Sequence, residues 1–142
     1  MLQRVLVGID FSEASREALK RGAGWAGQLH LPLAVIHVME VPSYPVVAPY
    51  AGMGDPSWFE DFSPKIEQRL QEWTASYPDT AIIVQSGNPA EVLVEEADPQ
   101  TLLVVGQVGH SKLEHLLFGS TAAKVVRHAP CDVLVVRAES KE

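Results

Sequence analysis

Four residues in the last third of the chain have the types and spacing that bind phosphate. Gly106 and Gly109 are three positions apart, and nine further residues separate Gly109 from the pair Gly119 and Ser120. Glycine lets the backbone turn sharply and approach a ligand closely, because it has no Cβ. A glycine-serine pair at a helix start adds unpaired N–H groups, a hydroxyl and the positive end of the helix dipole. The pattern predicts a phosphate site; the alternative is a plain turn at Gly119 and a helix cap at Ser120.

Other chemically suggestive patterns fit function less well. Residues 22–27 match G-x-G-x-x-G, but they lie inside a helical pattern and follow no strand, which favours tight helix packing over dinucleotide binding. Residues 110–115 read H-x3-E-H, one residue too long for the inverted zinc-protease motif, so no metal site is predicted. His37 is expected to be a hydrogen-bonded core histidine, and Cys131 a small buried apolar side chain.

The elements that must position the glycine loop alternate along the chain. Short apolar runs bounded by turn signals are typical of strands buried on both faces, and helical patterns separate them. This alternation predicts an α/β fold, a doubly wound five-stranded parallel sheet with helices on both faces. The expected strands are residues 5–9, 33–38, 80–85 and 102–105, and the fifth runs from Cys131 to Arg137.

Each helix has a start signal. Ser12 is the expected N-cap of the first helix, and Asn88 followed by proline opens the third. Pro64 is expected in the first turn of the second helix, whose apolar stripe is Ile66, Leu70, Trp73 and Tyr77. The fourth helix is expected over residues 120–128. From Met39 to Ser63 the apolar residues follow neither the helical nor the strand periodicity, so we expect a lid or an interaction loop there.

Length and composition limit the classes of function. We expect 142 residues to form a single domain over residues 1–142, and 46% hydrophobic and 20% charged residues are ordinary globular values. The formal net charge of −7 argues against nucleic-acid and anionic-membrane partners. One cysteine, no leader-like start and no long apolar run predict a cytoplasmic protein with no membrane insertion.

These motifs together resemble the universal stress protein (UspA-like) family. Its ATP-binding branch carries G-x2-G-x9-G-[ST], which the glycine loop matches at every fixed position. Residues 5–12 (VLVGIDFS) are similar to the family's first strand and turn, residues 36–38 to its second strand, and residues 129–136 to its last strand. The resemblance extends essentially from end to end.

The resemblance implies a strand order of 3-2-1-4-5, which places the ends of strands one and four side by side. It also implies that adenine and ribose contact Ile9, Asp10 and Val38. The implied phosphate contacts are Gly106, Gly109, Gly119, Ser120 and Thr121. Gln107 and Val108 stand where relatives often have small polar and basic residues. Any basic side chain that binds the phosphates would therefore have to come from another position.

The function that follows is an ATP-binding regulatory module of the stress response, with ATP or another adenine nucleotide as cofactor, together with Mg²⁺. The alternatives are a slow ATPase or nucleotide transferase, a partner-binding protein that senses AMP or cyclic AMP, and an interaction protein with a vestigial pocket. We expect no catalytic residues, because the sequence shows no general base and no two-metal carboxylate set. We also expect a homodimer through the strand from Cys131 to Arg137, an unprotected apolar edge in this order.

Overall fold

Five parallel strands form one sheet in the computed structural model, which describes residues 1–40, 57–107 and 120–138. The sheet order is β3-β2-β1-β4-β5, as the resemblance implied, and every neighbouring pair is parallel. The predicted strands are confirmed to within one residue at every end. The strands are β1 (Arg4–Gly8), β2 (Leu33–Met39), β3 (Ala81–Ser86), β4 (Thr101–Gly106) and β5 (Asp132–Val136).

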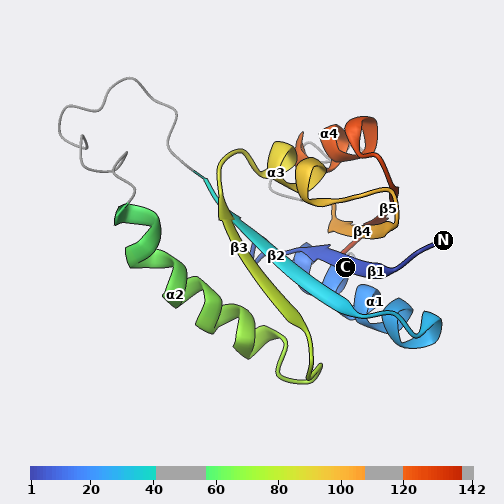
Figure 1. The fold of residues 1–142 in the computed structure, drawn as a ribbon, viewed down its shortest axis with the longest axis horizontal. Coiled ribbons are helices and arrows are strands. Elements are labelled where there is room, and N and C mark those ends of the chain that lie inside the picture. Colours follow the sequence, from blue (N-terminus) through green and yellow to red (C-terminus); the bar gives the residue numbers. More distant parts are fainter. Residues whose placement is uncertain (41–56, 108–119, 139–142) are drawn as a thin grey trace.

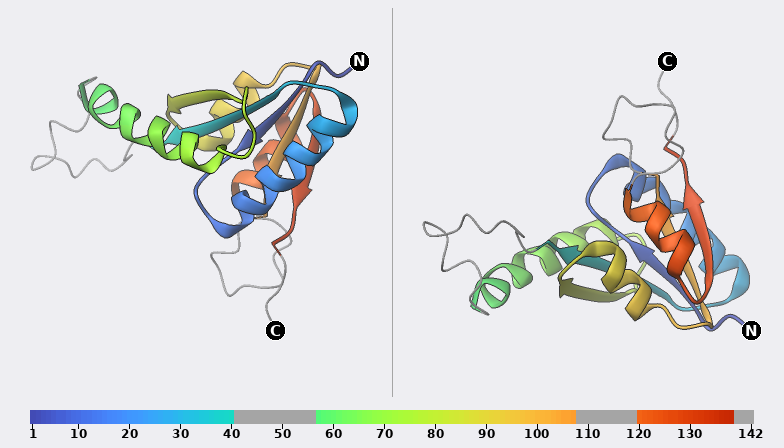
Figure 2. Two further views of the ribbon diagram at one scale, coloured as in Figure 1. Left: turned by 90° about the horizontal axis from the view of Figure 1, so that it is seen from below. Right: turned by 90° about the horizontal axis from the view of Figure 1, so that it is seen from above.

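Helices cover both faces of the sheet (Figures 1 and 2). The helices α1 (Glu13–Leu29) and α2 (Ser57–Trp73) pack on one face, and α3 (Pro89–Glu96) and α4 (Ser120–His128) pack on the other. Each face therefore has its own apolar core, and the central strand β1 contributes to both. Its alternate side chains do this: Leu6 points to the α3 and α4 side, whereas Val5 and Val7 point to α1 and α2.

The two predicted helix caps are confirmed. The Ser12 hydroxyl accepts a hydrogen bond from the backbone N–H of Ser15 at 3.1 Å, and the Asn88 side-chain oxygen accepts one from Glu91 N–H at 3.1 Å. Each cap satisfies one of the N–H groups that a helix start leaves without an intrahelical partner, and is worth about 1 kcal/mol. The caps also fix where the chain turns after β1 and β3.

The predicted start of the second helix was wrong. Pro64 lies inside α2, which begins seven residues earlier at Ser57. Proline is favoured in the first turn of a helix. In the helix interior it destabilises the helix, because it removes one backbone hydrogen bond and crowds the previous turn. Packing of the predicted stripe offsets this cost, because Leu70 is fully buried and Trp73 packs against the same core. The expected loop from Met39 to Ser63 was wrong at both ends, because Met39 belongs to β2 and residues 57–63 to α2; residues 41–56 lie outside the described residues.

The glycine pattern at residues 22–27 does have a packing role, but only at its first position. A Cβ on Gly22 would lie 2.5 Å from Cγ2 of Val7, so α1 approaches β1 too closely there for any side chain. Gly24 and Gly27 have open space around them. The prediction of tight helix packing is therefore confirmed for Gly22 alone.

Cys131 packs at the margin of the α3 and α4 core and is partly rather than fully buried. Burial raises the pKa of its thiol above the ordinary value for cysteine, which favours the protonated form over the reactive thiolate. Among the described helices, none is long and apolar enough to cross a membrane.

Candidate functional site

A cavity of about 490 Å³ opens at the carboxyl ends of β1, β2 and β4. This is where the strand order reverses, since the chain goes from β1 to β2 on one side and later returns to β4 on the other. Ligands of doubly wound sheets bind at such switch points, and the volume lies in the range of about 300–1,000 Å³ usual for small-molecule sites. Its lining residues are Gly8, Ile9, Asp10, Ser12, Ser15, Ile36, His37, Val38, Glu40, Pro89, Leu93, Val105, Gly106, Thr121 and Ala122.

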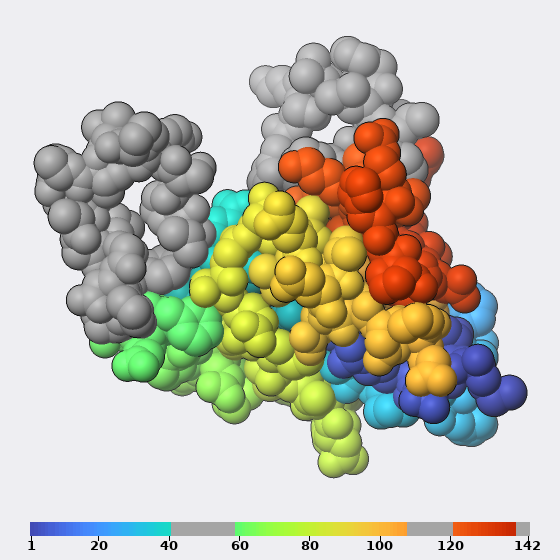
Figure 3. Space-filling model, turned by 45° about the horizontal axis from the view of Figure 1, so that its top comes forward, coloured from blue at the N-terminus to red at the C-terminus, as the bar shows by residue number. Residues whose placement is uncertain are grey.

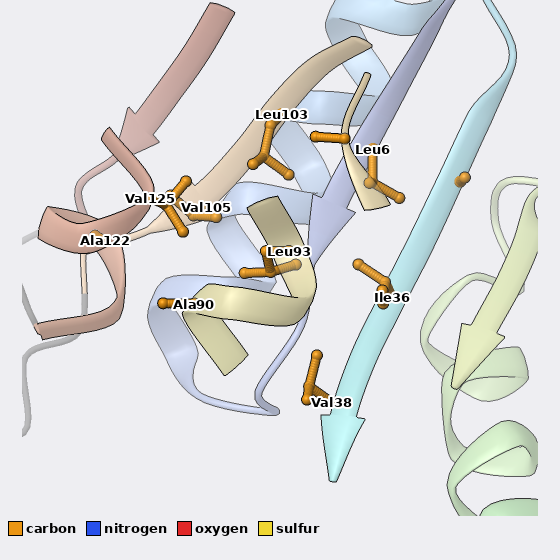
Figure 4. Close-up of a cluster of buried hydrophobic side chains, with 11 residues drawn as sticks. Leu6, Ile36, Val38, Ala90, Leu93, Leu103, Val105, Ala122 and Val125 are labelled. Carbon is orange, nitrogen blue, oxygen red and sulfur yellow. The ribbon is translucent and has the colours of Figure 1, made fainter. Parts of the chain in front are cut away.

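The floor of the cavity is apolar and comes from the core under α3 and α4. Figure 4 shows Ile36 and Val38 along β2, with Val38 near the end of the strand, and Leu93 projecting from α3 toward β1. In Figure 3, α3 and α4 lie side by side over this face. An apolar floor with polar groups at its rim suits a flat, partly apolar ligand such as a nucleobase.

Five of the eight predicted site residues line this one cavity: Ile9, Asp10, Val38, Gly106 and Thr121. They come from the ends of three strands and from the first turn of α4, so only the folded sheet brings them together.

Of the other three predicted residues, Ser120 is the first residue of α4 and so neighbours Thr121 at that helix start. Gly109 and Gly119 lie outside the described residues, as do residues 110–115.

The turn from β1 into α1 forms one wall of the cavity. Oδ1 of Asp10 accepts a hydrogen bond from the backbone N–H of Ser12 at 2.9 Å, and the Ser15 hydroxyl donates to the Ser12 carbonyl oxygen at 3.0 Å. With the Ser12 cap, these bonds make a compact, preorganised turn. Asp10 therefore has two roles, because its carboxylate stabilises the turn and the residue also lines the cavity.

Phe11 lies at the centre of this turn with a backbone φ of 65°, in the left-handed region. An L-residue with a bulky side chain pays about 1–2 kcal/mol for that conformation. Its ring packs on three neighbours: the centre of the His37 ring at 4.8 Å, the Trp73 ring edge-on at 5.2 Å and the guanidinium carbon of Arg69 at 4.0 Å. Aromatic pairs contribute about 0.5–1.5 kcal/mol each, enough to offset the cost.

His37 has the hydrogen bond that was expected of it, but it is not a core residue. Its Nδ1 lies 2.7 Å from the carbonyl oxygen of Ile9, and the residue is partly exposed and belongs to the lining of the cavity. Because a carbonyl oxygen only accepts, Nδ1 carries the proton. Sequence reasoning missed His37 as a site residue.

Gly106 has a packing requirement that the sequence did not reveal. A Cβ there would lie 2.6 Å from both the carbonyl carbon and the oxygen of Ala14, and 2.9 Å from its Cβ. The first turn of α1 therefore rests directly on the end of β4. Glycine at this position serves helix packing as well as access to the cavity.

Two further lining residues that the sequence did not indicate come from α3. Pro89 and Leu93 belong to a helix whose start was predicted, but nothing local shows that this start faces the ends of β1 and β2. Glu40, an exposed carboxylate just after β2, was passed over because it opens the loop without a pattern. In the described part of the chain, no group of three or more His, Cys, Asp or Glu side chains is placed to hold a metal ion.

Comparison with known proteins places the chain in a family. A sequence model of the Universal stress protein family matches residues 1–137, so the chain belongs to that family. A universal stress protein of Mycolicibacterium smegmatis is 32% identical over 139 residues, which cover 94% of this chain but only 45% of the relative.

Two solved structures agree with this placement. Universal stress protein UspA from Lactobacillus plantarum is 26% identical, with a TM-score of 0.74 over 95% of this chain and 97% of its own. A universal stress protein crystallised in complex with cAMP is 27% identical, with a TM-score of 0.66 over 97% of this chain and 98% of its own.

Proposed function

We propose that this chain binds an adenine nucleotide, ATP in the first place, and acts as a regulatory module of the stress response. The observation that carries the proposal is the convergence of Asp10, Val38, Gly106 and Thr121 on one cavity at the switch point of the sheet. The phosphate motif and the resemblance indicated these residues without any knowledge of the cavity.

The cavity has two ends of different character. Ile9 and Val38 are almost completely buried, and Asp10 adds a carboxylate beside them, which suits a base and the hydroxyls of a ribose. The lining on the α4 side comes from Thr121, at the start of that helix. A helix N-terminus favours an anion. Gly109 and Gly119 would extend this phosphate site from outside the described residues.

Mg²⁺ fits this site as a companion of the nucleotide. The described cavity offers two exposed carboxylates, Asp10 and Glu40, and no larger acidic cluster. Mg²⁺ often uses one or two carboxylates together with phosphate oxygens and waters, so the ion would come with the triphosphate.

Cyclic AMP is the second candidate ligand. The solved universal stress protein that is 27% identical to this chain is in complex with cAMP. A cyclic monophosphate needs the same base and ribose contacts but fewer phosphate donors. Comparing ATP with cAMP on the same protein therefore tests how much the start of α4 contributes.

The test is isothermal titration calorimetry with Mg-ATP, AMP, cAMP and GTP on the wild-type chain and two variants. Asp10→Asn keeps an oxygen for the Ser12 N–H but removes the charge, and Thr121→Val removes the hydroxyl at constant shape. Each should weaken ATP binding roughly three- to tenfold, the loss of one hydrogen bond. Asp132→Asn, at the opposite end of the strands, is the matched control and should bind normally.

Wild-type protein that binds none of the four nucleotides would refute the proposal. Equal affinity for GTP and ATP would refute the adenine assignment alone. Mass spectrometry of the nucleotide that co-purifies with the protein provides an independent check on which ligand the site selects.

We propose a binding rather than a catalytic role for the site. Two of its titratable side chains are engaged by the wall of the cavity, since Asp10 accepts from Ser12 N–H and His37 donates to the Ile9 carbonyl oxygen. A group held in this way serves shape and ligand contact better than activation of a water molecule. Slow hydrolysis remains the alternative, and phosphate release measures it.

We propose that the chain forms a homodimer through β5. β5 is an outer strand of the described sheet, and the Val136 carbonyl oxygen accepts a hydrogen bond from Gln107 on the β4 side at 2.8 Å. Successive residues of a strand direct their backbone groups to opposite sides, so Val133 and Val135 direct theirs to the open edge. Their side chains are partly exposed, and a second copy of β5 would cover both features.

A further inference from the structure

The β1–α1 turn is contacted at two points by one side chain of β2. His37, on β2, donates from Nδ1 to the carbonyl oxygen of Ile9 at 2.7 Å and packs against the ring of Phe11 in a tilted arrangement, with centroids 4.8 Å apart and planes at 41°. Ile9 and Phe11 are the residues immediately before and after Asp10. The imidazole therefore contacts the turn on both sides of the carboxylate that lines the cavity.

The conformation of the turn needs such support. Phe11 adopts a left-handed φ of 65°, which favours glycine, asparagine or aspartate rather than a bulky side chain. Residues held in such conformations persist where the surroundings over-determine them, often at ligand sites. Here the surroundings are an aromatic ring and a cation. Trp73 meets the Phe11 ring edge-on at 5.2 Å, and the guanidinium carbon of Arg69 lies 4.0 Å from the centre of the Phe11 ring.

The contacts that hold the turn extend through Trp73 of α2 to Arg16 of α1. The guanidinium carbon of Arg16, on the first turns of α1, lies 4.1 Å from the centre of the Trp73 ring. The ring of Phe11 is thus packed between the ring of His37 and the side of α2 that carries Trp73. Phe11 turns its side chain toward α2, while its neighbours Asp10 and Ser12 line the cavity.

We infer that His37 and Phe11 are positioning residues for nucleotide binding. The His37 imidazole, fixed as the Nδ1–H tautomer, anchors the Ile9 carbonyl, and Phe11 locks the left-handed turn, so that the Asp10 carboxylate faces the ligand. This inference rests on the proposed function. It adds that the affinity for an adenine nucleotide depends on an aromatic contact on the α2 side of the sheet.

A set of His37 variants tests the anchor. The side-chain amide nitrogen introduced by His37→Asn would stand at the same distance along the side chain as Nδ1, so this variant keeps the donor, whereas His37→Leu removes it. We expect His37→Leu to weaken Mg-ATP binding roughly three- to tenfold and His37→Asn to recover most of the loss. His128→Leu, an exposed histidine at the far end of α4, is the control.

A double-mutant cycle separates positioning from a general loss of structure. If His37 acts through Asp10, Asp10→Asn should cost much less affinity in the His37→Leu background than in the wild type. Phe11→Asn tolerates the left-handed φ but removes the ring, and should show the same coupling to Asp10→Asn. Equal, additive losses would overturn the inference even though nucleotide binding itself is intact.

Two further measurements do not depend on affinity. Long-range ¹H–¹⁵N spectra of the nucleotide-free protein should show the His37 proton on Nδ1, and the opposite tautomer would overturn the inference. Thermal unfolding of each variant shows whether it folds, and Phe11→Tyr keeps the ring if Phe11→Asn does not fold. Wild-type protein that binds no nucleotide would refute the proposed function first, and this inference with it.

Discussion

Replacing Gly106 by alanine tests how closely α1 rests on the end of β4. The new Cβ would lie 2.6 Å from the carbonyl carbon and the oxygen of Ala14, whereas carbon atoms in ordinary contact are about 3.5–4.0 Å apart. Both contacted atoms belong to backbone in the first turn of a capped helix. That backbone cannot swing aside as a flexible side chain would, so α1 as a whole must shift.

The magnitude follows from two opposing effects. Gly→Ala within a strand normally gains about 0.5–1 kcal/mol, because alanine loses less conformational entropy on folding. Overpacking a close contact costs about 1–3 kcal/mol, and this overlap falls on backbone, toward the upper end. We expect Gly106→Ala to lower the free energy of unfolding by about 1–2 kcal/mol, with a fall in Tm of a few degrees per kcal/mol for a chain of this size.

Urea unfolding followed by circular dichroism measures this change, and Gly24→Ala is the matched control. Gly24 lies on the exposed side of α1 with no atom within 4 Å of its would-be Cβ, so the same substitution should stabilise the chain by about 0.5–1 kcal/mol. Opposite signs for the two variants support the contact. A Gly106→Ala midpoint at or above that of the wild type would refute the reasoning.

Three other predictions concern the helix cap, the assembly and turnover. Asn88→Ala removes the acceptor of the Glu91 N–H and should cost about 1 kcal/mol of stability in the same urea assay, while Asn88→Ser should restore most of it. Light scattering of the wild type should give twice the chain mass of 15.5 kDa, and Val135→Pro, which removes an N–H directed to the open edge and no hydrogen bond of the sheet, should give a folded monomer. A Val135→Pro dimer would argue against pairing through β5. Phosphate release from ATP should stay far below about 10 per second, the median of ordinary enzymes, and a rate near that value would contradict the binding role.

The choice of Val135 illustrates what the structure adds to a sequence-based design. From the sequence, Val135 and Val136 are equivalent members of one apolar run. In the fold Val136 is 1% exposed and belongs to the core against α1, so a charge there would unfold the chain rather than separate two copies. The alternation of side chains and backbone groups along β5 makes Val135 the usable position.

The alternation of apolar runs with capped helical segments determined the α/β class and nearly every element, because burial on both faces leaves no polar positions in a strand. The start of α2 could not be predicted in this way. Pro64 is a strong local signal, but the tertiary packing of Leu70 and Trp73 on the sheet stabilised a helix that runs through it. Local preference is worth less than the burial of a long apolar stripe.

By itself, the sequence determined the strands and three of the four helix starts, since these depend on short-range patterns, and with the resemblance it indicated five residues that line the cavity. Only the tertiary structure decided that Pro89 and Leu93 of α3, and His37 of β2, belong to the lining of the cavity. It also decided that Gly106 must be glycine because of Ala14, a residue more than ninety positions away. Contacts of this kind join segments far apart in the chain, and their distances depend on how strands and helices pack, which no local pattern of residues records.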